Sequence, residues 1–185
     1  MKCQEKYLSE CFAQPPLIAF KHQSNIRDCL IKSKIPPKPK PYPERRRKGM
    51  SKCGKNCTAC PFIIQGKEVR IDAKNTWHIE RQVSCETYNS IYLIQCKKEN
   101  CRQRYIGTSG RQLKFRLSDH RGYISNQVVS KATGHHFNLP GHSLAHLGIT
   151  ILEQTRGNSE EYRKEREKYF IRRFDTYNNG INREW

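Results

Sequence analysis

Length, composition and charge limit what this chain can be. Its 185 residues fit one domain with an additional arm. It carries 35 lysines and arginines against 17 aspartates and glutamates, and the net charge of +18 predicts a polyanionic partner or an anionic membrane surface.

Hydropathy and cysteine content exclude several classes of protein. The sequence contains no run of about 18 apolar residues, so we expect no membrane-spanning helix and no membrane partner. Residues 1–10 lack the apolar core of a signal peptide, which favours an intracellular, non-secreted protein. The nine cysteines are odd in number. In an intracellular chain they indicate thiols or metal sites rather than a disulfide scaffold.

Residues 1–50 are predicted to form a connector and a basic, proline-rich linker. Residues 25–34 have a short amphipathic helical pattern, and a loosely packed tail is the alternative. Residues 35–48 are rich in proline, which favours an extended spacer. The basic cluster at residues 44–48 could contact phosphates or act as a nuclear localisation signal, and a solvated linker is the simpler alternative. No ligand spacing involves Cys3, Cys11 or Cys29.

Residues 51–89 form a cysteine-rich segment with ligand spacing typical of zinc. Its expected ligands are Cys53, Cys57, Cys60 and Cys85. His78 is the second choice for the fourth ligand, and reduced cysteines in a loop are the alternative to a metal site. Short strands are expected at residues 62–65 and 68–71. Such a small segment buries too little apolar area to fold alone, and a metal would supply the missing free energy.

A β-hairpin is predicted at residues 90–107. Residues 91–94 are apolar, β-branched and aromatic, as a strand requires, and a second short run follows at residues 105–107. A hairpin drawn this way places Tyr92 and Tyr105 on neighbouring strands, where both face one pocket.

A helix is predicted from about residue 110 to residue 122, with Thr108 or Ser109 as its N-cap. Its inward stripe contains Arg116 and His120 among apolar residues. A buried arginine needs a partner that offsets its desolvation. From the pattern alone, Arg116 could instead extend to solvent and His120 could be an ordinary core histidine.

Two further pairs of ligands predict a second zinc site. Cys96-x4-Cys101 lies in the hairpin turn and His136-x5-His142 follows the first helix, and both spacings suit tetrahedral zinc. His135 could replace His136, and histidines that contact phosphates are the alternative. Because the two pairs are far apart in sequence, they do not form a compact DNA-reading finger. The metal would instead pin the hairpin turn to the loop beyond the helix.

The C-terminal part predicts a strand at residues 147–153 and a helix at residues 160–174, which Ser159 caps. The inward stripe of this helix includes Glu167 among apolar neighbours. An unpaired buried carboxylate is costly, and a nearby metal ion or arginine relieves that cost. An ordinary glutamate–arginine pair is the alternative.

The hairpin also carries the residues of a known family. Ser90-Ile91-Tyr92 followed by Tyr105-Ile106-Gly107 resembles the signature tripeptides of GIY-YIG nucleases, with serine in place of the first glycine. The cysteine and histidine pairs resemble the version found in Penelope-like retroelements, and the resemblance covers about residues 48–182. It implies an α/β (α+β) fold with a small central three-stranded antiparallel or mixed sheet flanked by helices. The nuclease domain would span residues 90–185.

The resemblance assigns catalytic roles that the patterns leave open. The implied catalytic residues are Tyr92, Tyr105, Arg116, His120, Glu167 and Asn182. Glu167 would hold a hard cation, Mg²⁺ or Mn²⁺, and Asn182 would support the active site. Family comparison favours Tyr92 as the base and Tyr105 as the residue that orients water or phosphate. The residues themselves do not choose between the tyrosines, and His120 could share the base role.

The implied activity is that of a metal-dependent DNA endonuclease that leaves 5′-phosphate and 3′-hydroxyl ends, with structural Zn²⁺. Nicked target DNA would prime a reverse transcriptase portion of the same element, and the location would be nuclear. The basic residues expected to contact DNA, or to form a solvated rim, are Lys97, Lys98, Arg102, Arg104, Arg111 and Lys114. The main alternative is a non-catalytic nucleic-acid-binding zinc module, and a metal-sensing or redox protein is a third hypothesis.

Overall fold

The computed structural model describes residues 48–54, 57–157 and 159–183. Most of the N-terminal arm, including the helix predicted at residues 25–34 and the cysteines before it, lies outside the described residues. The described residues belong to one compact unit. No helix in this part of the chain is long and apolar enough to cross a bilayer.

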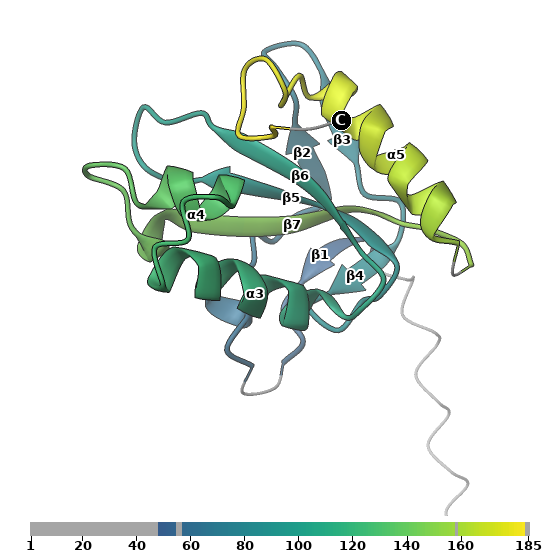
Figure 1. Cartoon of the computed structure of the whole chain (residues 1–185). Helices are drawn as coiled ribbons and strands as arrows, with labels where there is room; N and C mark the ends of the chain where they lie inside the picture. The colour runs from purple at the N-terminus through teal and green to yellow at the C-terminus, as the bar shows by residue number, and fades with distance from the viewer. Residues whose placement is uncertain (1–47, 55–56, 158, 184–185) are drawn as a thin grey trace, which may run out of the picture. The chain divides into compact units, whose positions relative to one another are not determined.

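A three-stranded antiparallel sheet forms the centre of the molecule. β5 (Ser90–Cys96) lies between β6 (Arg104–Ser109) and β7 (Leu147–Gln154). Nearly every residue of β5 is buried, because elements cover both faces of the sheet. The sheet and its flanking helices confirm the mixed α/β class and the small central sheet that the sequence predicts, as Figure 1 shows.

The β5–β6 pairing sets the positions of the two signature tyrosines. Tyr92 is paired with Gly107, and Ile94 is paired with Tyr105. Paired residues on antiparallel strands point to the same face of a sheet. Both phenol rings therefore lie on one face, with ring centroids 6.4 Å apart, as the hairpin drawn from the sequence predicts.

Helix α3 (Leu113–Ser125) lies on the face that carries the tyrosines, because its residues Arg116 and His120 contact the hydroxyl of Tyr92. Its N-cap differs from the prediction. Ser109 belongs to β6, and its hydroxyl donates to the carbonyl of Arg111. The N–H groups of Leu113 and Lys114, at the start of α3, donate instead to the carbonyls of Thr87 and Cys85. The backbone of a remote loop thus provides the caps that a side chain would otherwise supply.

The cysteine-rich segment packs against the sheet in several short pieces. β1 (Gly49–Ser51) pairs in parallel with β4 (Gln82–Ser84), and β2 (Glu68–Arg70) pairs with β3 (Thr76–His78). β2 matches the strand predicted at residues 68–71. The strand predicted at residues 62–65 is wrong. A 3₁₀ turn, Cys60–Phe62, occupies its start because Pro61 sits in the first turn, and only Ile63 bridges to β7.

Two helices complete the unit. Helix α4 (Ala132–Phe137) and a 3₁₀ turn (Leu144–His146) lie in the histidine-rich segment, where the sequence predicts a loop. Helix α5 (Glu160–Arg173) agrees with the predicted helix, and the hydroxyl of Ser159 accepts from the N–H of Tyr162 as its cap. α5 lies on the opposite side of the sheet from α3 (Figure 1).

Candidate active site and metal clusters

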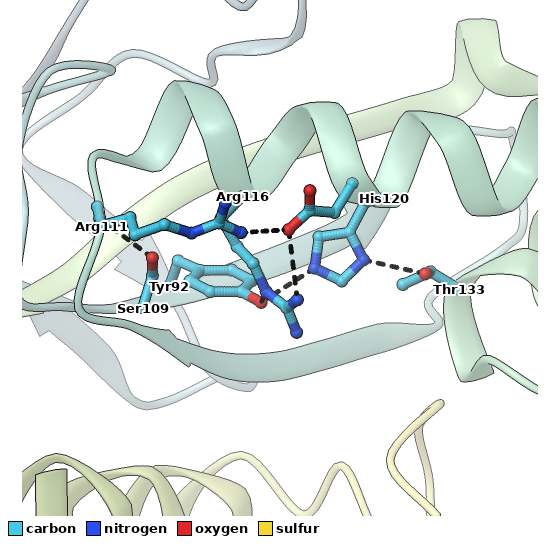
Figure 2. Close-up of polar contacts among 7 residues, drawn as sticks. Tyr92, Ser109, Arg111, Arg116, His120 and Thr133 are labelled. Atoms are coloured by element: carbon cyan, nitrogen blue, oxygen red, sulfur yellow. Dashed lines mark hydrogen bonds and ion pairs between the residues drawn. The ribbon is translucent and has the colours of Figure 1, made fainter.

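A chain of buried polar contacts connects β5, α3 and α4. Nε of Arg116 donates to the hydroxyl of Tyr92 at 2.9 Å, and the same hydroxyl lies 2.8 Å from Nε2 of His120. Nδ1 of His120 lies 2.9 Å from the hydroxyl of Thr133. Figure 2 shows these side chains in a row beneath α3. The structure therefore brings together Tyr92, Arg116 and His120, which the sequence predicts as site residues.

The two tyrosines differ in their access to solvent. Tyr92 is fully buried, at 0% exposure. Tyr105 is half-buried and lines a cavity of about 290 Å³. Burial raises the pKa of both phenols, and for Tyr92 the neighbouring Tyr105 adds to the rise while Arg116 opposes it. Both tyrosines are thus neutral phenols at physiological pH, and a phenolate base would need a strong compensating charge.

Glu167 comes from α5, which packs beside the edge strand β6. It lines the same cavity as Tyr105, and the backbone N–H of Thr108 and the charge of Arg116 both act on its carboxylate. Burial raises the pKa of Glu167 to about 7, and Arg116, Lys164 and the Thr108 N–H oppose that rise. A half-buried carboxylate that faces an open cavity suits a hard divalent cation. Glu167 therefore offers one carboxylate to a cation in this cavity, where the family resemblance implies Mg²⁺.

Asn182 has a structural part in the same region. Its side-chain oxygen accepts from the N–H of Ile106 at 2.8 Å, and its amide donates to the carbonyl of Ile106 at 2.9 Å. These are backbone groups of an edge strand, which otherwise need a partner when buried. Asn182 therefore holds β6 in place beside Tyr105.

An acidic residue that the sequence did not single out lies beside Arg116. Asp119 is within 3.6 Å of Nη1 of Arg116 and also pairs with Arg111. Because Asp119 follows Arg116 by three residues on one helix, their helical spacing could have revealed the pair. Arg111 forms this ion pair from a side chain that is 62% exposed.

The four cysteines of the N-terminal segment converge on one point. Their sulfur atoms lie 3.5 Å apart for Cys53 and Cys60, 3.6 Å for Cys57 and Cys85, and 3.9 Å for Cys60 and Cys85. Sulfurs about 2.3 Å from a common centre in a tetrahedron lie about 3.8 Å apart, whereas a disulfide needs about 2.05 Å. The cluster could hold zinc. The alternative ligand His78 lies apart from it, beside Glu68.

Cys96, Cys101, His136 and His142 form the second cluster. Their ligand atoms all lie within 4.8 Å of one another. Nε2 of His142 is buried and has no hydrogen-bond partner among the described residues, as expected of a nitrogen that binds a metal. This cluster could also hold zinc. His136, rather than the exposed His135, provides the third ligand atom.

The six predicted DNA contacts are not equivalent in the structure. Lys98 and Arg102 line a cavity of about 830 Å³ beside the second cluster. Arg104 differs from the prediction: its guanidinium donates to the carbonyl of Ile71 and stacks on the ring of Phe174, because alternate residues of β6 face opposite sides of the sheet. Lys114 is 3.8 Å from Glu86. Lys97 packs along Gly148 of β7.

One functional-site residue, Thr133, was missed by sequence reasoning altogether. It is buried in α4, and its hydroxyl contacts His120 of another helix. A single hydroxyl in the segment Ala132–Phe137 produces no periodicity and no ligand spacing, so the sequence carries no signal for it.

The chain matches no known protein family, no curated protein and no solved structure. The case for its function therefore depends on the residues and their geometry.

Proposed function

We propose that this chain is a metal-dependent DNA endonuclease of the GIY-YIG type. The observation that carries the proposal is the convergence of side chains from three elements. Arg116 from α3 donates to Tyr92 of the hairpin, and the ring of Tyr92 lies 6.4 Å from that of Tyr105. Tyr105 and Glu167 from α5 line one cavity. A basic chain of net charge +18 supports a polyanionic substrate.

Each side chain has a part in hydrolysis of a phosphodiester. Nε of Arg116 donates to Tyr92 and Nη1 lies near Asp119. When DNA binds, the fork would exchange these partners for the scissile phosphate, where it would stabilise charge that develops during the reaction. Glu167 would hold Mg²⁺, which neutralises charge on a nonbridging oxygen and on the leaving 3′ oxygen. Tyr105, which faces the cavity, would orient the attacking water.

The deprotonation step runs through Tyr92 and His120. Because burial opposes a phenolate, we infer that Tyr92 passes its own proton to Nε2 of His120 as its oxygen takes a proton from the attacking water. The water would reach this buried oxygen once Arg116 turns from Tyr92 to the scissile phosphate. Burial and, secondly, the charge of Arg116 lower the pKa of His120 to about 3, so its imidazole is neutral before the reaction. A phosphate bound to Arg116 offsets that charge and makes His120 a better acceptor. The products are 5′-phosphate and 3′-hydroxyl ends.

A plasmid assay tests the proposal. Wild-type protein with Mg²⁺ is expected to convert supercoiled DNA to the nicked form. Glu167→Gln, which keeps the shape of the side chain, and Arg116→Ala should each lower the rate by on the order of 100-fold. Lys168→Ala, at an exposed position beside Glu167, is the matched control and should nick normally. Wild-type protein that binds DNA but never nicks it would contradict the proposal.

That last outcome would favour the alternative, a nucleic-acid-binding zinc module without activity. The observation behind the alternative is Ser90, which replaces the first signature glycine. Its buried hydroxyl has no hydrogen-bond partner among the described residues. If the enzyme is active, the family resemblance extends the proposal to the nuclear nicking of target DNA for a retroelement. The free 3′-hydroxyl would then be used by a reverse transcriptase of the same element.

A further inference from the structure

Thr133 and His120 are joined by a contact that the proposed catalytic steps do not include. The hydroxyl of Thr133 lies 2.9 Å from Nδ1 of His120. Thr133 is 1% exposed and His120 is 2% exposed, so water does not compete for either group. The two residues come from different helices, α4 and α3, and Figure 2 shows the hydroxyl at the end of the row that begins at Tyr92.

The hydrogen-bond network assigns the position of each proton. Nε of Arg116 always carries a proton and donates it to the oxygen of Tyr92. The phenolic proton of Tyr92 is then directed to its other partner, Nε2 of His120, which must accept. A neutral imidazole that accepts at Nε2 carries its own proton on Nδ1. That proton is donated to the hydroxyl of Thr133.

We propose that Thr133 is a positioning residue for catalysis: its hydroxyl accepts the Nδ1 proton of His120 and thereby keeps Nε2 free to receive the phenolic proton of Tyr92. The proposal rests on the proposed nuclease function. Thr133 touches neither substrate nor metal in this scheme, and it acts by fixing the tautomer and the ring orientation of His120.

The position of Thr133 is fixed by the packing of α4. A β-carbon at Gly134 would lie 2.2 Å from the carbonyl oxygen of Val128, so α4 lies closer to the preceding loop than any other residue there would allow. The amide of Asn138 donates to the carbonyls of Ile124 and Gly134, which ties the end of α4 to α3. The hydroxyl of Thr133 is therefore held against His120 by the backbone of its own helix.

α4 also contains a ligand of the second metal cluster. His136 follows Thr133 by three residues, about one helical turn. Zinc bound by that cluster would hold α4 in place. The same metal would therefore hold the Thr133 hydroxyl against His120.

Loss of the hydroxyl alone should disturb this arrangement without a change of shape. Valine has the size of threonine but cannot accept a hydrogen bond. In Thr133→Val, a proton on Nδ1 of His120 would be buried without a partner, so the Nδ1-protonated form loses its advantage and the Nε2-protonated form becomes populated. In that form Nε2 could no longer accept from Tyr92, and the phenolic proton would have no acceptor.

Three measurements on the full chain test the proposal, with Thr133→Ser as the conservative variant that keeps a hydroxyl. The first is long-range proton–nitrogen NMR of histidine-labelled protein. The expected result is a Nδ1-protonated His120 in wild type and in Thr133→Ser, and a shift toward the Nε2-protonated form in Thr133→Val. The second is the single-turnover nicking rate, which should fall by on the order of tenfold in Thr133→Val and recover in Thr133→Ser.

The third measurement separates positioning from damage to the fold. DNA affinity without Mg²⁺ and zinc content should be equal in all three proteins, because Thr133 contacts neither DNA nor metal. A Thr133→Val protein that keeps the Nδ1 tautomer and the wild-type nicking rate would overturn the proposal. So would a Thr133→Ser protein that retains zinc but nicks as slowly as Thr133→Val. Wild-type protein that does not nick would instead overturn the proposed function, while the NMR result still decides whether Thr133 sets the tautomer.

Discussion

Tyr92 and Gly107 face each other across the β5–β6 pair, and the tyrosine hydroxyl occupies the space that a side chain at residue 107 would need. A β-carbon at Gly107 would lie 2.5 Å from the hydroxyl oxygen of Tyr92 and 2.8 Å from a ring carbon of Tyr105. Because real β-carbons do not approach other atoms this closely, only glycine allows both phenols to lie on this face. The last glycine of the second signature tripeptide thus has a steric explanation.

The substitution Gly107→Ala is therefore expected to displace Tyr92 from Arg116. Tyr92 is fully buried and cannot move without strain, so the free energy of unfolding should fall by about 1–3 kcal/mol, and nicking should be largely lost. Gly122→Ala is the matched control: no atom lies within 4 Å of its β-carbon, and alanine favours the helix by up to about 1 kcal/mol. Denaturant unfolding and the plasmid assay measure both effects. A Gly107→Ala protein with wild-type stability would contradict the steric account.

Because Glu167 is largely buried, the free energy of unfolding should depend on pH in the absence of divalent metal. Burial raises its folded-state pKa to about 7, above the ordinary 4.5, so the folded protein binds this proton more tightly than the unfolded chain. The stabilisation is present below about pH 4.5 and is lost as the pH rises through about 7, by about 3 kcal/mol. Mg²⁺ must displace this proton, so its apparent affinity should increase as the pH rises toward 7.

The comparison of wild type with Glu167→Gln isolates this effect. His120 acts in the opposite direction, because its lowered pKa of about 3 costs stability as the pH falls below about 6.5, but that term is common to both proteins. The difference in unfolding free energy between the two proteins, measured from pH 4.5 to pH 8 without added metal, should change by about 3 kcal/mol. A constant difference over this range would show that Glu167 is not buried in the folded state.

The limits of prediction from the sequence follow from the physics of each element. β5, β7 and α5 could be predicted because hydrophobic periodicity and a local cap define them. The N-cap of α3 could not, because its hydrogen-bond partners are backbone groups of Cys85 and Thr87, which only the folded chain brings near. α4 is a short helix that contains glycine and two adjacent histidines, and it forms because of packing rather than propensity.

The residues of the site also divide into those that the sequence predicts and those that only tertiary packing brings together. Ligand spacing was sufficient to predict both metal clusters, since few arrangements of cysteine and histidine satisfy one tetrahedron. The helical pattern left Arg116 free to extend to solvent, and only the family resemblance placed it in one site with Tyr92. Thr133 contributes one polar atom at a distance set by tertiary packing, which no pattern in the chain encodes, whereas the i, i+3 spacing of Arg116 and Asp119 is visible in the sequence.

Both clusters should contain zinc, and each should be separable from the other. Purified protein is expected to contain two zinc ions per chain by elemental analysis. Cys85→Ser and Cys101→Ser should each lose one ion and keep the other. Since the carbonyl of Cys85 accepts from the N–H of Lys114 at the start of α3, loss of the first zinc should also disturb that helix and lower the free energy of unfolding by several kcal/mol. Two retained zinc ions in either variant would refute the ligand assignment for that cluster.

The basic residues of the hairpin turn should separate into two functional groups. Lys98 and Arg102 line the cavity beside the second cluster, so Lys98→Ala and Arg102→Ala should weaken DNA binding without loss of stability. Each should reduce the slope of log affinity against log salt concentration by about one.

Arg104→Ala should leave that slope unchanged and instead cost about 1–2 kcal/mol of stability, because it loses the bond to Ile71 and the contact with Phe174. Salt titrations of binding to a fixed duplex, with thermal unfolding in parallel, measure both quantities. If Arg104→Ala changed the salt slope as Lys98→Ala does, its guanidinium would lie on the DNA-binding surface and not within the fold.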